Sequence, residues 1–152
     1  MLKEGDNAPA FTLKSDEGNH ISLKDLKGKK VILYFYPKDD TSGCTAQACS
    51  FRDNIKMFEK QNTVVIGVSK DNTKSHQKFK IKYELPFTLL SDENLEMLKD
   101  YDVWKEKSMY GKKYMGIERT TFIIDEEGKI RKIFSKVKVE GHTEEVLQAL
   151  RY

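Results

Sequence analysis

Residues 31–49 read VILYFYPKDDTSGCTAQAC, and this stretch decides how the rest of the chain is interpreted. Its first six residues are the most apolar run in the sequence, which favours a strand that is covered on both faces. A polar turn follows and leads into a segment with helical periodicity. Both cysteines of the protein, Cys44 and Cys49, lie near the start of that predicted helix.

The predicted helix has a recognisable start and a recognisable buried face. Thr41 or Ser42 can cap it, because a hydroxyl at that position accepts a hydrogen bond from a free backbone N–H. Apolar residues at helical spacing mark the buried face: Ala48, Phe51, Ile55 and Phe58. We expect the helix to end near Gln61–Asn62.

The position of Cys44 at this helix start indicates a reactive thiol. A thiol becomes a good nucleophile only when it is ionised, and the free N–H groups and dipole of a helix N-terminus favour the thiolate. Gly43 leaves room beside the sulfur, Thr41 can donate to a substrate oxygen, and Pro37 can hold the turn rigid. The alternative is that Cys44 is an unreactive, buried small residue.

The spacing of the two cysteines constrains how they can react with each other. Residues five apart in an ideal helix have Cα atoms about 8.7 Å apart, whereas a disulfide needs them within about 7 Å. Cys44 and Cys49 can therefore bond only if the first helical turns unwind, which predicts a redox cycle coupled to local unfolding. The alternative is that Cys49 is a core residue and that an external thiol completes the cycle.

The remainder of the chain alternates predicted strands with predicted helices. Strands are expected at residues 10–13, 20–23, 63–69, 87–90, 120–124 and 130–134. Helices are expected at residues 71–83, after residues 91–93, and from a cap at Thr143 onward. Residues 104–116 lack periodicity and predict a loop. The whole predicts one α/β domain over residues 1–152, with a partly parallel central sheet, helices on both faces and an N-terminal β-hairpin.

The composition argues against several kinds of partner. A net charge of +3 with scattered lysines does not indicate nucleic-acid binding. No apolar run approaches the roughly 18 residues that span a bilayer, and the first residues lack the apolar region of a signal peptide. We therefore expect a cytoplasmic protein without membrane or nucleic-acid partners. That reducing compartment favours reactive cysteines over a structural disulfide.

No metal or other cofactor is predicted. The three histidines share no ligand spacing with the cysteines: His20, His76 and His142. The pair Asp39–Asp40 is typical of a solvated turn. Judged from the residues alone, Arg119 is an ordinary cation at the edge of a strand.

The segment from Pro37 to Cys44 resembles the active-site pattern of the peroxiredoxins, P-x-x-x-T-x-x-C. The spacing from there to Cys49 and the sequence GIERTTFIID at residues 116–125 are similar to the PrxQ branch, also called bacterioferritin comigratory proteins. Three further segments extend the resemblance over nearly the whole chain: Gly5–Pro9, Thr88–Asp92 and Val103–Trp104.

This resemblance implies a thioredoxin-like fold and a thiol-dependent peroxidase that reduces hydrogen peroxide and organic hydroperoxides. Cys44 would be the peroxidatic cysteine, oxidised to a sulfenic acid, and Cys49 the resolving thiol that condenses with it. Thr41 and Arg119 would bind and polarise the peroxide, assisted by the backbone amides of Gly43 and Cys44. Thioredoxin or a similar dithiol donor would reduce the resulting disulfide.

The resemblance has further implications and two departures. Pro37 would shield the site, and Tyr36 and Trp104 are candidate pocket residues, although such aromatics more often belong to the core. Ser42 stands where many members have proline, which affects only loop rigidity. Gln47 stands where many carry glutamate, so it receives no acid–base role. A monomer is expected, because a cysteine pair within one helix needs no partner subunit.

Two other functions are compatible with a pair of cysteines. A general disulfide oxidoreductase uses a C-x-x-C motif, which this chain lacks. A redox sensor or holdase would instead use an oxidised, partly unwound form to bind client proteins. The rate of reaction with peroxide distinguishes a redox sensor or holdase from a peroxidase, because only the peroxidase must react much faster than free cysteine.

Overall fold

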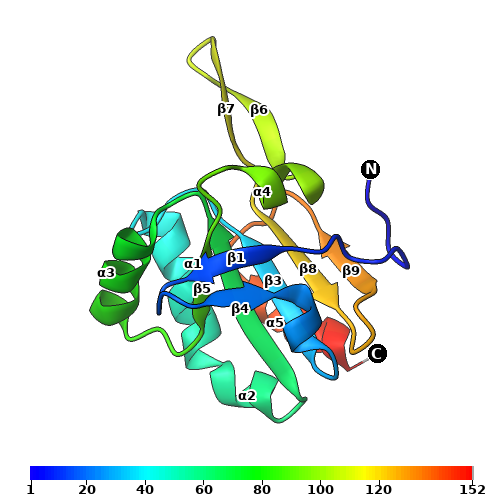
Figure 1. Ribbon diagram of the computed structural model, residues 1–152. Helices are drawn as coiled ribbons and strands as arrows, with labels where there is room; N and C mark the ends of the chain where they lie inside the picture. The colour runs from blue at the N-terminus through cyan, green and yellow to red at the C-terminus, as the bar shows by residue number, and fades with distance from the viewer. Residues whose placement is uncertain (152) are drawn as a thin grey trace.

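The strand predicted at residues 30–36 is β3 (Lys30–Phe35), which lies inside a seven-stranded sheet in the order β2-β1-β5-β4-β3-β8-β9 (Figure 1). The computed structural model describes residues 1–151. The other strands of this sheet are β1 (Thr12–Ser15), β2 (His20–Ser22), β4 (Thr63–Ser69), β5 (Thr88–Ser91), β8 (Thr120–Ile124) and β9 (Ile130–Phe134). β3, β4 and β5 run parallel and the other pairings are antiparallel, so the sheet is mixed as predicted.

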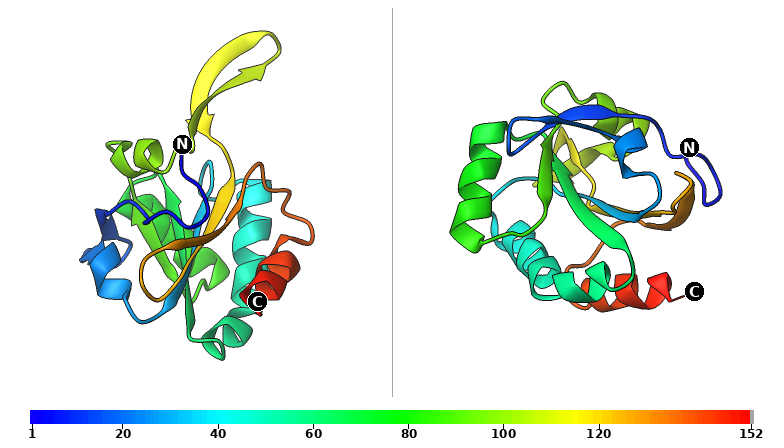
Figure 2. Two further views of the ribbon diagram at one scale, coloured as in Figure 1. Left: turned by 90° about the vertical axis from the view of Figure 1, so that its right-hand side faces the viewer. Right: turned by 60° about the horizontal axis from the view of Figure 1, so that its bottom comes forward.

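Both faces of the sheet are covered, which explains why β3 is apolar from Val31 to Phe35. Its side chains alternate between two buried clusters, with Leu33 and Phe35 in one and Ile32 and Tyr34 in the other. One face is covered by α1 (Ser42–Asp53), α2 (Ile55–Glu59), α3 (Thr73–Tyr83) and α5 (His142–Leu150), and the other by η1 (Leu23–Leu26) and α4 (Glu96–Asp100) (Figure 2). No helix in this described range is long and apolar enough to cross a membrane.

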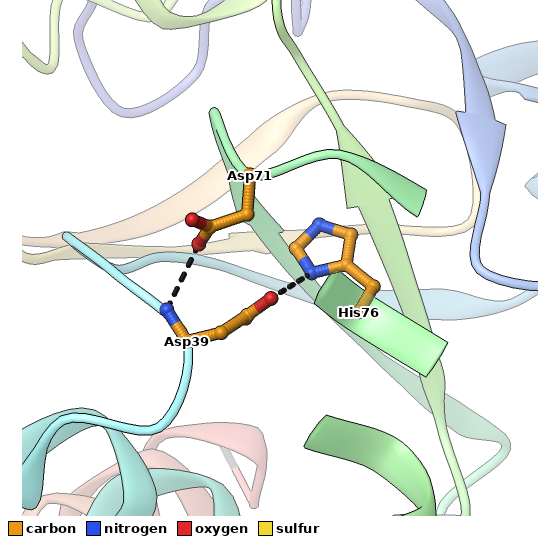
Figure 3. A group of neighbouring side chains, drawn as sticks. All are labelled: Asp39, Asp71 and His76. Carbon is orange, nitrogen blue, oxygen red and sulfur yellow. Dashed lines mark hydrogen bonds and ion pairs between the residues drawn. The ribbon is translucent and has the colours of Figure 1, made fainter. Parts of the chain in front are cut away.

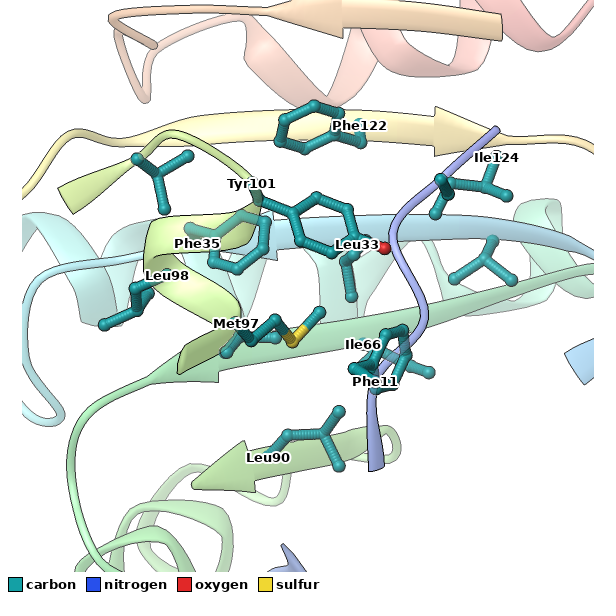
Figure 4. Close-up of a cluster of buried hydrophobic side chains, with 14 of the residues drawn as sticks. Phe11, Leu33, Phe35, Ile66, Leu90, Met97, Leu98, Tyr101, Phe122 and Ile124 are labelled. Carbon is teal, nitrogen blue, oxygen red and sulfur yellow. The ribbon is translucent and has the colours of Figure 1, made fainter. Parts of the chain in front are cut away.

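The cluster beneath α4 ties the N-terminal segment to the sheet (Figure 4). The ring of Tyr101 packs edge-on against Phe122, with centroids 5.2 Å apart, and its hydroxyl donates to the carbonyl of Pro9 at 2.7 Å. Burial raises the pKa of Tyr101. The predicted N-terminal hairpin is confirmed, because β1 pairs with β2 on one side and with β5 on the other.

The helix predicted to run from Thr41 to Gln61–Asn62 is interrupted at Asn54, so that part of the prediction is wrong. Asn54 has φ −111° and ψ 12°, and its side-chain amide donates to the carbonyl of Ser50 at 2.8 Å. That carbonyl is the acceptor which the backbone N–H of Asn54 would use in a continuous helix. The side chain thus competes with the helical hydrogen bond and separates α1 from α2.

The loop predicted at residues 104–116 is instead a β-hairpin of β6 (Trp104–Met109) and β7 (Lys112–Ile117). Tyr110 and Gly111 form its two-residue turn, both with positive φ, as hairpin turns of this length require. The hairpin projects from the body of the molecule (Figures 1 and 2). Because most of its residues face solvent on both sides, the apolar–polar alternation that identifies a half-buried strand is missing.

The predicted cap at Thr143 is also wrong. The residue before α5 is Gly141, with φ 77°, and Thr143 lies inside the helix. Its hydroxyl bonds to that of Ser50 on α1 at 2.6 Å, so it joins two helices instead of starting one. For α4, by contrast, the predicted capping region does contribute, since a carboxylate oxygen of Asp92 accepts the N–H of Leu98 at 2.7 Å.

Candidate active site

Cys44 lies in the first turn of α1, as the sequence predicts. A short loop joins β3 to Thr41, the N-cap residue, and Cys44 is the third residue of the helix. The N–H of Thr45 already bonds to the carbonyl of Thr41 at 2.8 Å, whereas the N–H groups before it belong to the free end of the helix. The thiol is buried, with 2% of the residue exposed. A helix N-terminus is therefore directed at a sulfur that is largely withdrawn from water.

Arg119 contacts the same sulfur from a position far along the chain. It directly precedes β8, whose first residue Thr120 pairs with Phe35 at the end of β3. This antiparallel pairing places Arg119 beside the loop that starts α1, and its Nη2 donates to Cys44 Sγ at 3.4 Å. The structure thus joins two residues that lie 75 positions apart in the sequence.

Gln47 is a third member of this group, and the sequence analysis assigned it no acid–base role. It lies one turn after Cys44 on the same side of α1, is 1% exposed, and accepts a hydrogen bond from Nη1 of Arg119 through Oε1. The guanidinium therefore contacts two residues of α1 at once. The signal that could have identified Gln47 is its i+3 spacing from Cys44, because residues three apart share a helix face.

Gly43 and Thr41 complete the rim of the site. A Cβ placed on Gly43 would lie 3.3 Å from Nη2 of Arg119, so glycine keeps the path of the guanidinium open. The hydroxyl of Thr41 donates to the carbonyl of Lys38 at 2.9 Å and makes no capping bond to the helix. Pro37 is half-buried at the beginning of the loop.

Cys49 lies five residues after Cys44 in the same helix. Both cysteines are free thiols, and Cys49 is half-buried. Because α1 is continuous between them, the expected Cα separation of about 8.7 Å exceeds the reach of a disulfide. The described conformation is therefore one in which Cys44 is placed for reaction and Cys49 is out of range.

Comparison with known proteins identifies the chain. The AhpC/TSA family model matches residues 4–133. A relative named putative peroxiredoxin bcp, from Coxiella burnetii, is 58% identical over 149 residues, which are 98% of this chain and 99% of the relative. The chain belongs to the peroxiredoxins of the Bcp type.

Two solved structures support the same assignment for the fold. A cysteine-to-serine variant of PrxQ from Xylella fastidiosa is 37% identical, with a TM-score of 0.94 over 99% of this chain and 96% of that one. Structures of a bacterioferritin comigratory protein from Xanthomonas campestris, which concern its alkyl peroxide reduction activity, give a TM-score of 0.89 at 40% identity, covering 93% and 90% of the two chains. This peroxiredoxin thus has a thioredoxin-like fold and is a thiol-dependent peroxidase.

A second cation lies near the site of this peroxiredoxin, on the projecting hairpin. Lys107 pairs with Tyr114 across β6 and β7, and its methylene groups pack over Gly116. Burial lowers the pKa of Lys107, and the charge of Arg119 lowers it further. The hairpin therefore contributes a positive charge to the surroundings of Cys44. Sequence analysis assigned this stretch to a loop and did not identify the lysine.

The two aromatic pocket candidates have no polar contact with Cys44 in the range 1–151. Tyr36 is buried in the Cys44 cluster, but its hydroxyl donates to Asp39 at 2.6 Å. Burial, followed by the negative charge of Asp39, raises the pKa of Tyr36. Trp104 packs against the cluster on the other face of the sheet. A pocket-lining role for Tyr36 and Trp104 stays a prediction.

One group of side chains has the composition of a metal site. Asp39, Asp71 and His76 offer ligand atoms that lie within 4.8 Å of one another (Figure 3). These atoms are already hydrogen-bonded within the protein, so we assign the group no metal. The predicted solvated turn is wrong for Asp39, which is buried, and correct for Asp40, which is exposed and pairs with Lys82 at 2.8 Å.

Proposed function

We propose that Cys44 is the nucleophile of this peroxidase. Its thiolate attacks one oxygen of the hydroperoxide and the O–O bond breaks. The sulfur keeps that oxygen as a sulfenic acid, and the other oxygen leaves as water or an alcohol after taking up a proton. The observation that carries this assignment is the hydrogen bond from Arg119 Nη2 to Cys44 Sγ at the start of α1. A permanent cation there stabilises the thiolate and the charge that develops on the peroxide oxygens.

The rim residues would hold the hydroperoxide in line with the sulfur. The backbone N–H groups of Gly43 and Cys44 belong to the free end of α1 and can donate to a peroxide oxygen. The Thr41 hydroxyl can accept the O–H of the substrate while it donates to Lys38, and rotation about its Cβ–Oγ bond would redirect its proton to the substrate. Pro37 would exclude water from one side.

Resolution of the sulfenic acid would fall to Cys49. The first turns of α1 unwind, the Cys49 thiolate attacks the sulfur of Cys44, and the S–O bond breaks. The hydroxide that leaves takes up a proton, from the Cys49 thiol or from solvent, and departs as water. The disulfide is then reduced by two successive thiol–disulfide exchanges with a dithiol donor of the thioredoxin type. The continuous helix between the two residues supports this order of events, because it must open before they can bond.

Two further properties, the oligomeric state and the location, follow from this cycle. Both cysteines of a pair within one helix come from the same chain, so resolution needs no second subunit, and we infer a monomer. A cycle that ends with reduction by a dithiol donor requires a reducing compartment, and we infer a cytoplasmic location.

Rapid mixing of the reduced protein with hydrogen peroxide tests these assignments. We expect a second-order rate constant far above that of free cysteine, which Cys44→Ser abolishes. Cys49→Ser should leave the first oxidation intact and stop the chain at the sulfenic acid, detected by mass spectrometry as a single added oxygen. An intramolecular disulfide in Cys49→Ser, or turnover in Cys44→Ser, would contradict the assignment. A rate equal to that of free cysteine would instead favour a redox sensor.

A further inference from the structure

The loop between β3 and α1 is fastened to the rest of the protein through one buried carboxylate, that of Asp39 (Figure 3). Its Oδ1 accepts the hydroxyl of Tyr36 at 2.6 Å. Its Oδ2 accepts the hydroxyl of Ser75 at 2.8 Å and lies 2.7 Å from Nδ1 of His76. Ser75 and His76 belong to the first turn of α3, so side chains join the loop to a helix that is remote in sequence.

His76 is fully buried and both of its ring nitrogens face acceptors. Nδ1 faces the carboxylate of Asp39, and Nε2 lies 3.0 Å from the carbonyl of Leu90 on β5. The imidazole ring is therefore held on both sides by groups of the protein, and the Asp39–His76 pair is enclosed within the fold.

The backbone at Asp39 is held as well. Its N–H donates to Oδ2 of Asp71 at 2.8 Å, and the same oxygen accepts the hydroxyl of Ser69 at 2.7 Å. The backbone N–H of Asp39 is thus held by a residue just after β4, and its carboxylate is held by residues at the start of α3. Beside this attachment, a cleft of about 530 Å³ separates the loop from part of α3, with Asp40, Lys78 and Phe79 among its lining residues. The hydrogen bonds, more than close packing, hold the loop there.

This attachment precedes the segment that must move. Asp39 lies two residues before the N-cap Thr41 and five before Cys44, while unwinding has to carry Cys44 toward Cys49. We propose that Asp39 and His76 are positioning residues, which hold the start of α1 in its folded, peroxide-reactive arrangement against the unwound arrangement that forms the disulfide. This rests on the proposed roles of the two cysteines.

The proposal predicts opposite sensitivities for the two chemical steps. If the unwound arrangement is a minor state, weakening the attachment increases its population in proportion but barely changes the major state. Loss of a buried hydrogen-bond partner corresponds to about a tenfold change. Asp39→Ala and His76→Ala should therefore accelerate disulfide formation about tenfold and change sulfenic acid formation less than twofold. They should also raise the peroxide concentration that overoxidises Cys44, because the sulfenic acid persists for less time.

The test is rapid mixing with hydrogen peroxide followed by acid quench, with sulfenic acid and disulfide quantified by mass spectrometry over time. Asp39→Asn is the conservative variant, since its amide can donate to Nδ1 of His76 and still accept from Tyr36, and it should restore rates close to wild type. Lys74→Ala, at an exposed position beside Ser75 on the same turn of α3, is the matched control and should leave both steps unchanged. Should Asp39→Ala fold poorly, Ser75→Ala removes one bond onto Asp39 from the helix surface and should show the same acceleration at smaller size.

Each outcome decides the proposal. Equal disulfide rates in Asp39→Ala, Ser75→Ala and wild type would overturn it, as would a parallel decrease of both steps, which indicates general damage to the site. Hydrogen exchange supplies an independent readout: amides at the start of α1 should exchange faster in Asp39→Ala while those of β3 keep their protection. If wild type itself forms no Cys44–Cys49 disulfide, the cysteine roles fail first, and this is visible without any variant of Asp39.

Discussion

Arg119 Nη2 lies 3.4 Å from Cys44 Sγ although 75 positions separate the two residues along the chain. The antiparallel pairing of β8 with β3 produces this proximity, because it places the residue before Thr120 next to the end of β3. A thiol on a helix and a cation beside a strand are thus brought together by the sheet. The proposed active site is assembled only once the two strands have paired.

Replacing Arg119 by lysine should lower the second-order rate constant with hydrogen peroxide about a hundredfold. Lysine keeps the positive charge but cannot donate to Cys44 and Gln47 at the same time, as the planar guanidinium does. Stopped-flow mixing measures the constant, and Arg131→Lys on β9 serves as the control for a general loss of arginine. A rate within twofold of wild type would show that charge alone is sufficient.

Gly43→Ala should separate stability from activity. Alanine in place of glycine within a helix stabilises it by about 0.5 to 1 kcal/mol. The new methyl group would lie 3.3 Å from Arg119 Nη2, so we expect it to displace the guanidinium and to slow the reaction with peroxide severalfold. Urea denaturation and stopped-flow mixing give the two quantities. Ser42→Ala, at the exposed preceding position, should leave the peroxide rate unchanged.

Gly67→Ala should destabilise the fold by about 1 to 3 kcal/mol. Gly67 lies in β4 between two large neighbours, and an added Cβ would lie 2.9 Å from the ring of Tyr34 and 3.0 Å from Leu89. Both neighbours are fully buried and have no room to move. Gly116→Ala is the control, because the nearest atoms there belong to the flexible Lys107 and to Tyr114. Equal losses of unfolding free energy for the two variants would contradict the packing argument.

His142 should make stability depend on pH. Burial lowers its pKa in the folded protein, an effect that Arg119 strengthens and Glu145 partly opposes. The unfolded chain therefore binds a proton near pH 6.5 that the folded chain does not bind, so the contribution of His142 to stability falls as pH decreases below that value. The glutamine in the His142→Gln variant has no group that titrates. The difference in unfolding free energy between wild type and His142→Gln should decline from pH 7 to pH 5, and a constant difference would refute the shift.

The sequence predicts the strands better than the irregular features, for a physical reason. The central residues of β3 and β4 form uncharged, mostly apolar runs, Val31–Phe35 and Val64–Val68, because both faces of the sheet are covered, and that requirement is visible locally. The interruption at Asn54 depends on one side chain competing for the carbonyl of Ser50, which no periodicity records. The β6–β7 hairpin was not predicted because its residues pack against little else and so need no alternation of apolar and polar side chains.

The candidate site likewise contains some residues that local sequence signals predict and others that they do not. Cys44 and Thr41 could be placed from local signals, the end of a strand and the cap of a helix. Gln47 and Asp39 are harder to place, because each contacts a residue far along the chain, Arg119 for Gln47 and His76 for Asp39. A turn with two aspartates looks solvated until α3 supplies the donors that allow one carboxylate to be buried.

The interruption at Asn54 limits how far a structural change in α1 can spread. Helix formation is cooperative along a continuous run of hydrogen bonds, so two short helices separated by a break can melt independently. α2 buries Phe58 in the core, where its ring lies 5.8 Å from that of Phe51 near the end of α1, beyond the first turns that have to open. Opening of α1 therefore need not uncover the apolar surface beneath α2. The proposed cycle opens the first turns of α1 at each turnover, and the break at Asn54 would then protect the protein against aggregation.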